Sequence, residues 1–274
     1  MSSQATRNAA LISLSALILA LALLSPSSAW SHGAADSDVE LHVGDAFKTC
    51  YFDLHPTLTQ EEFHDFAGAI GAILRFKQLA SAETLGRLNV DVGIAYSYAA
   101  IDDADDIWND TFTHPDDEHY LGTTIAFPRP QFRVGVTDQV DVGAWFSFNP
   151  QSNFGLFGFE SKIALLRGAT PLDLAVRPHV SFLVGPEDLS VVNVSADLAV
   201  SRSFSGLAPY LGAGVSGTVA IEHADDVELD NAVSLDAVGF GGLELRWSHL
   251  SVGAQTEITT AGVPGFSARV SGTF

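Results

Sequence analysis

Hydrophobic and polar residues alternate along the chain from Leu88 to the C-terminus. In residues 88–98 the even positions are apolar or aromatic and the odd positions are polar or small. Residues 140–148 and 250–258 repeat this period of two. Only an extended chain turns successive side chains to opposite faces, so the pattern predicts β-strands.

Ten segments carry this pattern, most of them far longer than the ~5–6 residues of an average strand. Their length suits the ~9–11 residues with which a tilted strand crosses a bilayer. The pattern therefore predicts an all-β fold, a transmembrane antiparallel up-and-down β-barrel of about ten strands over residues 88–274. The segments are 88–98, 124–136, 140–148, 154–165, 172–184, 190–202, 210–221, 233–247, 250–258 and 266–274.

The connections between these segments alternate in length. Such a barrel has long outer loops and short inner turns, with both ends of the barrel sequence on the inner side. The links after strands two and eight, 137–139 and 248–249, are tight, whereas 99–123 and 222–232 are the longest and most acidic. The outer loops are predicted to be 99–123, 149–153, 185–189, 222–232 and 261–265.

Aromatic residues gather near the strand ends, as they do in the two girdles of a membrane barrel. Trp247 and Phe274 are expected near the inner ends. The outer girdle is expected to contain Tyr96, Tyr98, Phe146, Phe148, Phe157, Phe159 and Phe266. Pro128, Pro130 and Pro178 fit poorly in paired strands, because proline donates no backbone hydrogen bond.

The chain ends in mid-strand on Phe274, after Phe266, Ala268, Val270 and Gly272 at alternate positions. This ending resembles the C-terminal strand of Gram-negative outer-membrane β-barrels, including small porin-like and opacity-like barrels, although Gly272 is smaller than that pattern usually has. The resemblance implies a location in the cell outer membrane. It also implies contact with the barrel-assembly machinery through the terminal strand, and with outer-membrane lipid and lipopolysaccharide.

The N-terminus resembles a secretory signal peptide. Arg7 precedes an apolar run, and Ser27 and Ala29 fit the small-residue positions before a cleavage site. Residues 1–29 are therefore predicted to be a signal peptide, with an uncleaved anchor as the alternative. Cleavage after Ala29 would put His32 third in the mature chain, where an amine, two amides and an imidazole can hold copper or nickel.

Residues 30–87 form a segment before the barrel. Thr59 and Glu62 make a capping box, and Phe63, Phe66 and Ile70 follow at helical spacing. A short amphipathic helix is predicted over about 60–74, on the periplasmic side of the first strand, either plugging the barrel or packing beneath it. An alternative makes residues 75–79 part of an extra strand, which would give twelve strands.

The inward positions carry charges of both signs, which can either pair into a network that fills the lumen or line a narrow ion path. Because about ten strands leave little more room than side chains fill, a mostly closed interior is favoured. The predicted lumen residues are Arg129, Arg133, Glu160, Lys162, Arg177, His179, Asp197, Asp236, Glu244, Arg246, Glu257 and Arg269.

The chain has 33 acidic and 13 basic residues, which excludes the basic footprint that nucleic-acid binding needs. Carboxylates in the first and fourth outer loops suit Ca²⁺ or Mg²⁺, possible cofactors that would bridge to lipopolysaccharide, although the spacing matches no EF-hand. A solvated acidic surface is the simpler interpretation. The candidate metal ligands are Asp102, Asp103, Asp105, Asp106, Asp116, Asp117, Glu118, Asp225 and Asp226.

No catalytic motif is recognisable, so an enzyme is not expected. Cys50 is the only cysteine and is interpreted as a buried apolar residue, with a reactive thiol as the alternative. Omptin-like proteases are also ten-stranded barrels, and His114, His119 and His223 lie near carboxylates. The chain is therefore expected to be a structural outer-membrane barrel or a narrow pore, with a cation-binding surface module or a rim hydrolase as alternatives.

Overall fold

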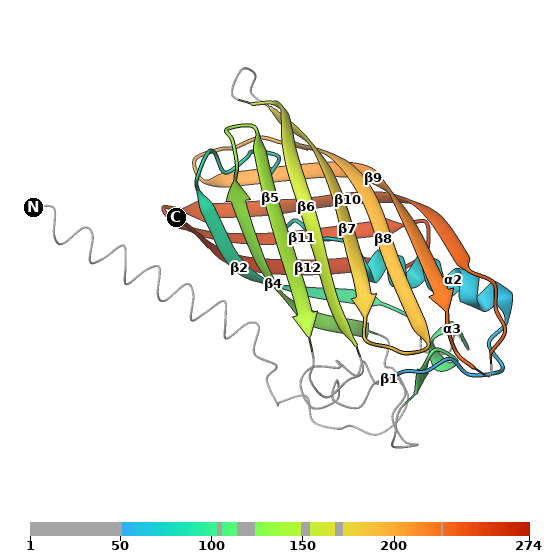
Figure 1. Ribbon diagram of the computed structural model, residues 1–274. Helices are drawn as coiled ribbons and strands as arrows, with labels where there is room; N and C mark the ends of the chain where they lie inside the picture. The colour runs from blue at the N-terminus through green and yellow to red at the C-terminus, as the bar shows by residue number, and fades with distance from the viewer. Residues whose placement is uncertain (1–50, 103–105, 114–123, 149–153, 168–171, 226) are drawn as a thin grey trace, which may run out of the picture.

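Ten antiparallel strands close into a single barrel, in which each strand pairs with its neighbours in sequence and β12 closes against β2 (Figure 1). This is a computed structural model, which describes residues 51–102, 106–113, 124–148, 154–167, 172–225 and 227–274. The predicted fold class and strand count are confirmed. The strands are β2 (Val90–Ala100), β4 (Thr124–Gly135), β5 (Val140–Phe148), β6 (Gly155–Leu166), β7 (Asp173–Val184), β8 (Leu189–Ser201), β9 (Leu207–Glu222), β10 (Ala232–Trp247), β11 (Leu250–Thr259) and β12 (Gly265–Thr273).

The alternative with twelve strands is wrong. Residues 75–79 belong to no strand, and the only other described sheet pairs β1 (Tyr51–Phe52) with β3 (Phe112–Thr113) outside the barrel. Two helices complete the described structure, α2 (Gln60–Leu74) and α3 (Asp106–Asn109).

The two ends of the barrel differ. We call the end where β2 begins and β12 ends the turn end; its connections are 136–139, 167–172, 202–206 and 248–249. The opposite end, the loop end, has the connections 101–123, 149–154, 185–188, 223–231 and 260–264. Phe274 therefore lies at the turn end, and its backbone pairs with Val90 there.

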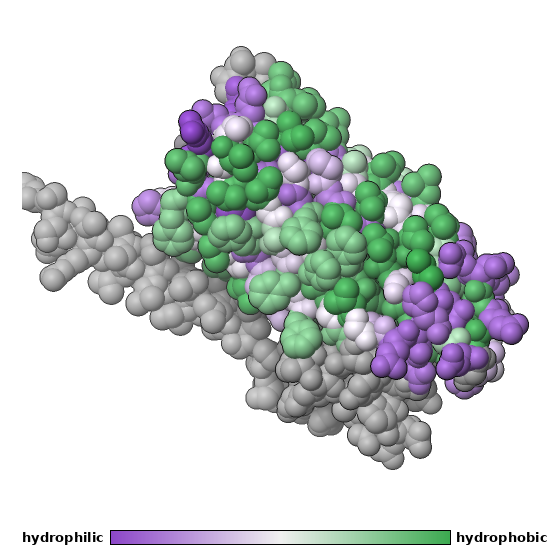
Figure 2. All heavy atoms as spheres, in the orientation of Figure 1, coloured by the Kyte–Doolittle hydropathy of each residue, from purple (hydrophilic) through white to green (hydrophobic). Residues whose placement is uncertain are grey.

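Period-two alternation divides each strand between a polar interior and an apolar exterior. On β9, for example, Val215 is 56% exposed while its neighbours in the same strand, Ser216 and Thr218, are buried. Figure 2 shows hydrophobic residues across the wall that the strands present, and hydrophilic residues gathered at the end near α2. A barrel with an apolar outside and a polar inside is inverted relative to a water-soluble protein and suits a bilayer.

Exposed aromatic rings lie where the girdles were expected. Phe146, Phe148, Phe159 and Phe266 are exposed toward the loop end, and Tyr98 contacts Phe266 across the β2–β12 pair. Trp247 and Phe274 are exposed at the turn end, where Phe274 stacks on His249.

Three of the four prolines in the strands lie beside interruptions in the hydrogen-bonded ladders. β4 pairs with β5 only over Gln131–Gly135, so Pro128 and Pro130 face a part of β5 to which β4 is not paired. Both prolines stay paired with β2, so the donors they lack are on the β5 side. Pro178 lies in the gap of the β6–β7 ladder between His179 and Val176. Proline therefore removes donors where no partner strand accepts them.

Helix α2 begins and ends as the sequence predicts. Thr59 caps its N-terminus: the Thr59 hydroxyl accepts from the Glu62 backbone, and the Glu62 carboxylate accepts from the Thr59 backbone. The Thr59 hydroxyl also donates to the Glu62 carboxylate, and the bonds that this carboxylate accepts from the Thr59 hydroxyl and backbone lower the pKa of Glu62. No helix in the described parts of the chain is long and apolar enough to cross a membrane.

Of the two placements predicted for this helix, the structure shows the one inside the barrel, but the predicted side, where the first strand begins, is wrong. The described part of the chain starts at the loop end, where β1 pairs with the β3 strand of the first loop. Helix α2 enters the lumen from there, and residues 75–88 continue to the turn end, where the chain turns into β2 (Figure 1). We call residues 60–88 the lumen segment.

Small residues let the lumen segment pack closely. A Cβ on Gly71 of α2 would clash with the side chain of Thr218 on β9, and one on Gly253 of β11 would meet the Leu79 carbonyl. At the turn end, a Cβ on Gly135 would clash with the backbone of Gly86. Glycine is needed at these positions because two backbones, or a backbone and a wall side chain, approach closely.

We predict that Val215→Arg destabilises the protein in lipid vesicles by about 2–4 kcal/mol, the cost of an arginine facing lipid at mid-bilayer. Equilibrium unfolding in urea measures the change. Thr137→Arg, in an exposed turn, is the control and should change the free energy of unfolding little. Equal effects of the two substitutions would contradict the assignment of the β9 outer face to lipid.

Candidate functional site

The candidate functional site is the barrel interior. Eleven of the twelve charged residues predicted for the lumen are buried there, and Arg246 at the turn end has a side chain 34% exposed. Their arrangement depends on the lumen segment, because several of them bond to it rather than to one another.

At the turn end, one carboxylate binds several donors. Asp91 on β2 accepts from Arg133 (Nε at 3.1 Å and Nη2 at 2.9 Å) and from Arg269, and also from the hydroxyls of Ser271 and Thr273. These groups come from β2, β4 and β12, so the cluster ties the two ends of the barrel sequence together. A carboxylate with this many donors is held in one position.

Cations on β6 and β7 bond to the backbone of the lumen segment. Lys162 donates to the carbonyls of Ser81 and Glu83, and Arg177 donates to those of Ala80 and Ser81. Lys162 also lies 3.8 Å from Asp141. Residues 80–83 of the lumen segment pair with no strand. These wall side chains therefore satisfy backbone carbonyls that would otherwise be buried without a partner.

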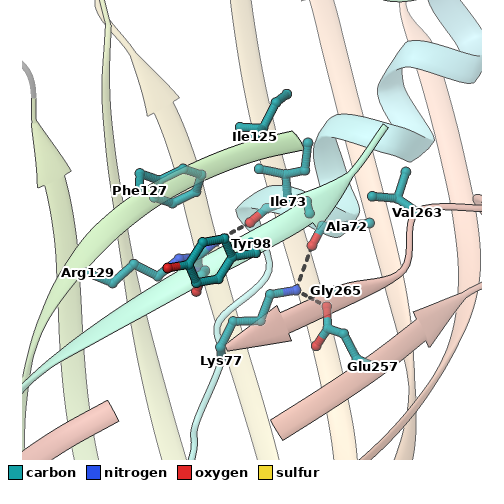
Figure 3. Close-up of a pocket in the computed structure, with 12 residues that line it drawn as sticks. Ala72, Ile73, Lys77, Tyr98, Ile125, Phe127, Arg129, Glu257, Val263 and Gly265 are labelled. Atoms are coloured by element: carbon teal, nitrogen blue, oxygen red, sulfur yellow. Dashed lines mark hydrogen bonds and ion pairs between the residues drawn. The ribbon is translucent and has the colours of Figure 1, made fainter. Parts of the chain in front are cut away.

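Midway along the lumen, the segment contributes its own charges. Arg75 binds Asp197 on β8 at 2.5 Å and Glu257 on β11 at 2.9 Å, and all three side chains are buried. Lys77 binds the same Glu257 and donates to the Ala72 carbonyl (Figure 3). The ion pairs thus connect the segment to two strands on different parts of the wall.

Cationic side chains also bind backbone carbonyls at the C-terminus of α2. Arg129 on β4 donates to the carbonyls of Ile73 and Arg75, and Lys77 donates to that of Ala72 (Figure 3). These carbonyls have no partner within the helix, and positive charge there complements the helix dipole. The guanidinium of Arg129 also lies over the ring of Trp145, 4.2 Å from its centroid.

Above these charges, the loop end is closed by an apolar layer. Phe63 and Phe66 of α2 are fully buried, and Phe66 packs against Trp108 of α3 and Phe52 of β1. Phe52 in turn contacts Phe112 and Phe154 with ring centroids 4.1 and 4.9 Å apart. The interior therefore has a dry layer at the loop end and a charged region below it.

Two cavities open at the ends of the interior. The cavity at the loop end has a volume of about 570 Å³ and lies between α2, the first loop, β10 and the β11–β12 loop; its charged lining consists of Asp65, Asp102 and Asp236, with His64 beside them. The cavity at the turn end, about 190 Å³, is lined by Asp91, Arg133, Glu244 and Arg246 among others.

The structure describes few of the predicted metal ligands. Asp102 and Asp225 are exposed, and no group of three metal-ligating side chains forms among the described residues. Asp106 lies in α3, and its side chain is outside the described part. Asp103, Asp105, Asp116, Asp117, Glu118 and Asp226 lie outside the described residues, as do Cys50, His32, His114 and His119. The exposed His223 lies 3.1 Å from the Ser190 hydroxyl.

Several residues of the interior were not predicted. Asp91 and Asp141 are at inward positions of the period-two pattern, which could have identified them. Arg75, Lys77 and Glu83 carry no such signal, because residues 75–88 form neither a strand nor a helix. Their place in the lumen follows only from contacts distant in sequence.

The chain matches no protein-family model and no curated protein. The solved structures similar to it include an outer-membrane channel from Pseudomonas putida F1, at 9% identity and a TM-score of 0.41, over 73% of this chain and 100% of that one. LpxR from Salmonella typhimurium is 9% identical with a TM-score of 0.37, over 66% of this chain and 99% of LpxR. Ail, the attachment invasion locus protein of Yersinia pestis, is 11% identical with a TM-score of 0.32, over 69% of this chain and 99% of Ail. At such values these likenesses identify no family and carry no argument about function.

We predict that Asp91→Ala lowers the free energy of unfolding by about 3–5 kcal/mol, because two buried guanidinium groups lose their shared carboxylate. Equilibrium denaturation in lipid vesicles measures the effect. Asp225→Ala, which removes an exposed carboxylate, is the control and should change stability by less than about 0.5 kcal/mol. An Asp91→Ala effect no larger than that of the control would contradict the role of this cluster.

Proposed function

We propose that the protein is an outer-membrane β-barrel with its loop end facing the outside of the cell. The apolar outer surface, the even number of strands and the longer connections at the loop end support this orientation. The C-terminal Phe274 at the turn end would then face the periplasm, where the barrel-assembly machinery would bind it. Lipopolysaccharide would surround the loop end.

Within that membrane, we propose a narrow pore that its own lumen segment keeps closed. The observation that carries this proposal is the binding of Arg75 and Lys77 to Glu257, with Arg75 also on Asp197. These contacts hold the segment across the lumen by side chains, without a ladder of backbone hydrogen bonds. Such a plug blocks larger solutes and can be loosened without unfolding the barrel.

We predict that Glu257→Gln increases ionic conductance. The substitution removes the carboxylate that Arg75 and Lys77 share, so the lumen segment is held less tightly. Single-channel recording in planar bilayers should show rare small openings for the wild type and more frequent or larger openings for the variant.

Glu187→Gln is the matched control, because it makes the same change at an exposed loop position. It should conduct like the wild type. Large steady openings of the wild type would contradict a closed plug, and complete silence of folded wild type and Glu257→Gln alike would contradict the pore.

A second candidate function is cation binding at the outer surface. The 570 Å³ cavity favours it, because acidic side chains but no lysine or arginine line this cavity. Asp236, which is buried there, accepts hydrogen bonds from Ser234 and Thr260. Ca²⁺ or Mg²⁺ is the ligand that carboxylate oxygens suit best; with fewer than three of the described carboxylates close together, an ion would also need water or lipopolysaccharide oxygens as ligands.

We predict that, if this second function holds, millimolar Ca²⁺ raises the unfolding temperature by at least about 2–4 °C, since a ligand bound only to the folded state stabilises it. Asp236→Asn should reduce the shift, and Glu187→Gln should leave it unchanged. An unfolding temperature that does not respond to Ca²⁺ or Mg²⁺ would remove cation binding as a function.

A further inference from the structure

One part of the barrel wall contains an unusual number of buried polar atoms without partners. Strand register aligns two neighbouring rows of inward residues across β4–β7: the first contains Gln131, Trp145, Gly158 and Ser181, and the second Arg133, Gly143, Glu160 and His179. Every member of these rows except the glycines leaves a buried nitrogen or oxygen without a hydrogen-bond partner among the described residues: Gln131, Arg133, Trp145, Glu160, His179 and Ser181.

The same rows continue onto β8 and β9, where the polar groups are paired. Asn193 and Thr218 extend the first row, and Ser195 and Ser216 extend the second. Asn193 donates to Ser216 and Thr218, and Ser195 donates to Asn193 and Ser216. Within these two rows, the unpaired atoms therefore lie on β4–β7 and not on β8 or β9.

The two glycines lie between the unpaired groups. A Cβ on Gly158 would clash with both Trp145 Nε1 and Ser181 Oγ, so these two atoms point over the glycine from opposite sides. A Cβ on Gly143 would come within 2.8 Å of the aliphatic Cγ of Arg133 and 2.9 Å of Glu160 Oε1. The glycines therefore let these side chains pack against the wall backbone, while Trp145 Nε1 and Ser181 Oγ find no partner among the described residues, the condition in which buried water is found.

Charged side chains of this region also leave atoms without direct partners in the described structure. Glu160 is buried and its Oε2 has no hydrogen-bond partner among the described residues, although Arg133, Lys162, Arg177 and Arg269 all act on the carboxyl group electrostatically. In the described part of the chain, Arg177 binds backbone carbonyls through Nη2 and leaves Nε and Nη1 without partners. A buried charge without direct partners requires solvation, which bound water or a small ion would provide.

This region borders the cavity at the turn end. Arg133 belongs to the second row and also lines that cavity of about 190 Å³. Toward the loop end, the first row is followed by Arg129, Leu156 and Leu183, and Arg129 lies over the ring of Phe127 in the apolar layer. The turn end is therefore the side from which water and ions would reach the region.

We propose that strands β4–β7 and the lumen segment enclose a hydrated site for water and small ions, reached from the turn end. The site deepens the proposed function by naming the route that ions take through the charged half of the barrel. Only the passage of ions rests on the narrow-pore proposal. Hydration of the site does not, because water can reach it in a barrel that is closed at the loop end.

Cysteine accessibility tests the site. On a Cys50→Ser background, Ser181→Cys places a thiol in the hydrated region, and Ser216→Cys places one in the paired region; both serines are almost fully buried, 0% and 3% exposed. The full-length refolded protein is treated with methyl methanethiosulfonate, and the mass of the intact chain is followed over time. We expect the Ser181→Cys thiol to react at least about tenfold faster than the Ser216→Cys thiol, because reaction at a dry buried site must wait for local opening.

Gln131→Cys, in the same row on β4, is a second variant in case Ser181→Cys fails to fold, and it should react as fast. Equal slow rates at the β4–β7 and β9 positions would overturn the hydrated site. The pore proposal is tested separately by recording from the same proteins. A fast-reacting thiol in a protein that never conducts would support the site and remove the pore, whereas conductance with an unreactive thiol would overturn the site and keep the pore.

Discussion

The structure depends on how a charged, irregular stretch of chain is accommodated inside a closed barrel. Residues 75–88 form no regular structure, so their backbone groups need partners from the wall. Wall cations supply them: Arg129, Lys162 and Arg177 each donate to carbonyls of the lumen segment. In return, Arg75 and Lys77 neutralise Asp197 and Glu257, which would otherwise be buried carboxylates in a narrow space. Wall and segment are therefore complementary, because each supplies partners for buried polar groups of the other.

This complementarity divides the lumen into layers. An apolar layer of α2 and the surrounding rings closes the loop end, and the ion pairs of Arg75 and Lys77 lie directly beneath it. The lower half is polar and opens at the turn end. Hydrophobic constrictions stop ion flow by excluding water, so α2 would be the gate of the proposed pore. The proposed pore would open by movement of this helix, which leaves the ten-stranded wall intact.

The sequence predicts the wall well and the lumen segment poorly, for different physical reasons. Lipid and lumen select residues at alternate positions, so all ten strands are recognisable within three residues of their observed ends. The capping box at Thr59 and the apolar spacing after it define α2 in the same local way. The location of that helix at the loop end depends on contacts such as those of Gly71 with Thr218 and Phe66 with Trp108. No period in the sequence encodes these long-range contacts, and for the same reason the sequence does not predict the partners of Arg75.

The proposed plug requires that the lumen segment enters the barrel at the loop end and leaves it at the turn end. Labelling intact cells with a membrane-impermeant maleimide, on a Cys50→Ser background, tests this path. Glu61→Cys, exposed in the first turn of α2, should be labelled, and Gln139→Cys, exposed in a turn at the opposite end, should be labelled only after the outer membrane is permeabilised. Protection of the Glu61→Cys thiol in intact cells, with labelling only after permeabilisation, would place α2 on the periplasmic side and contradict this account.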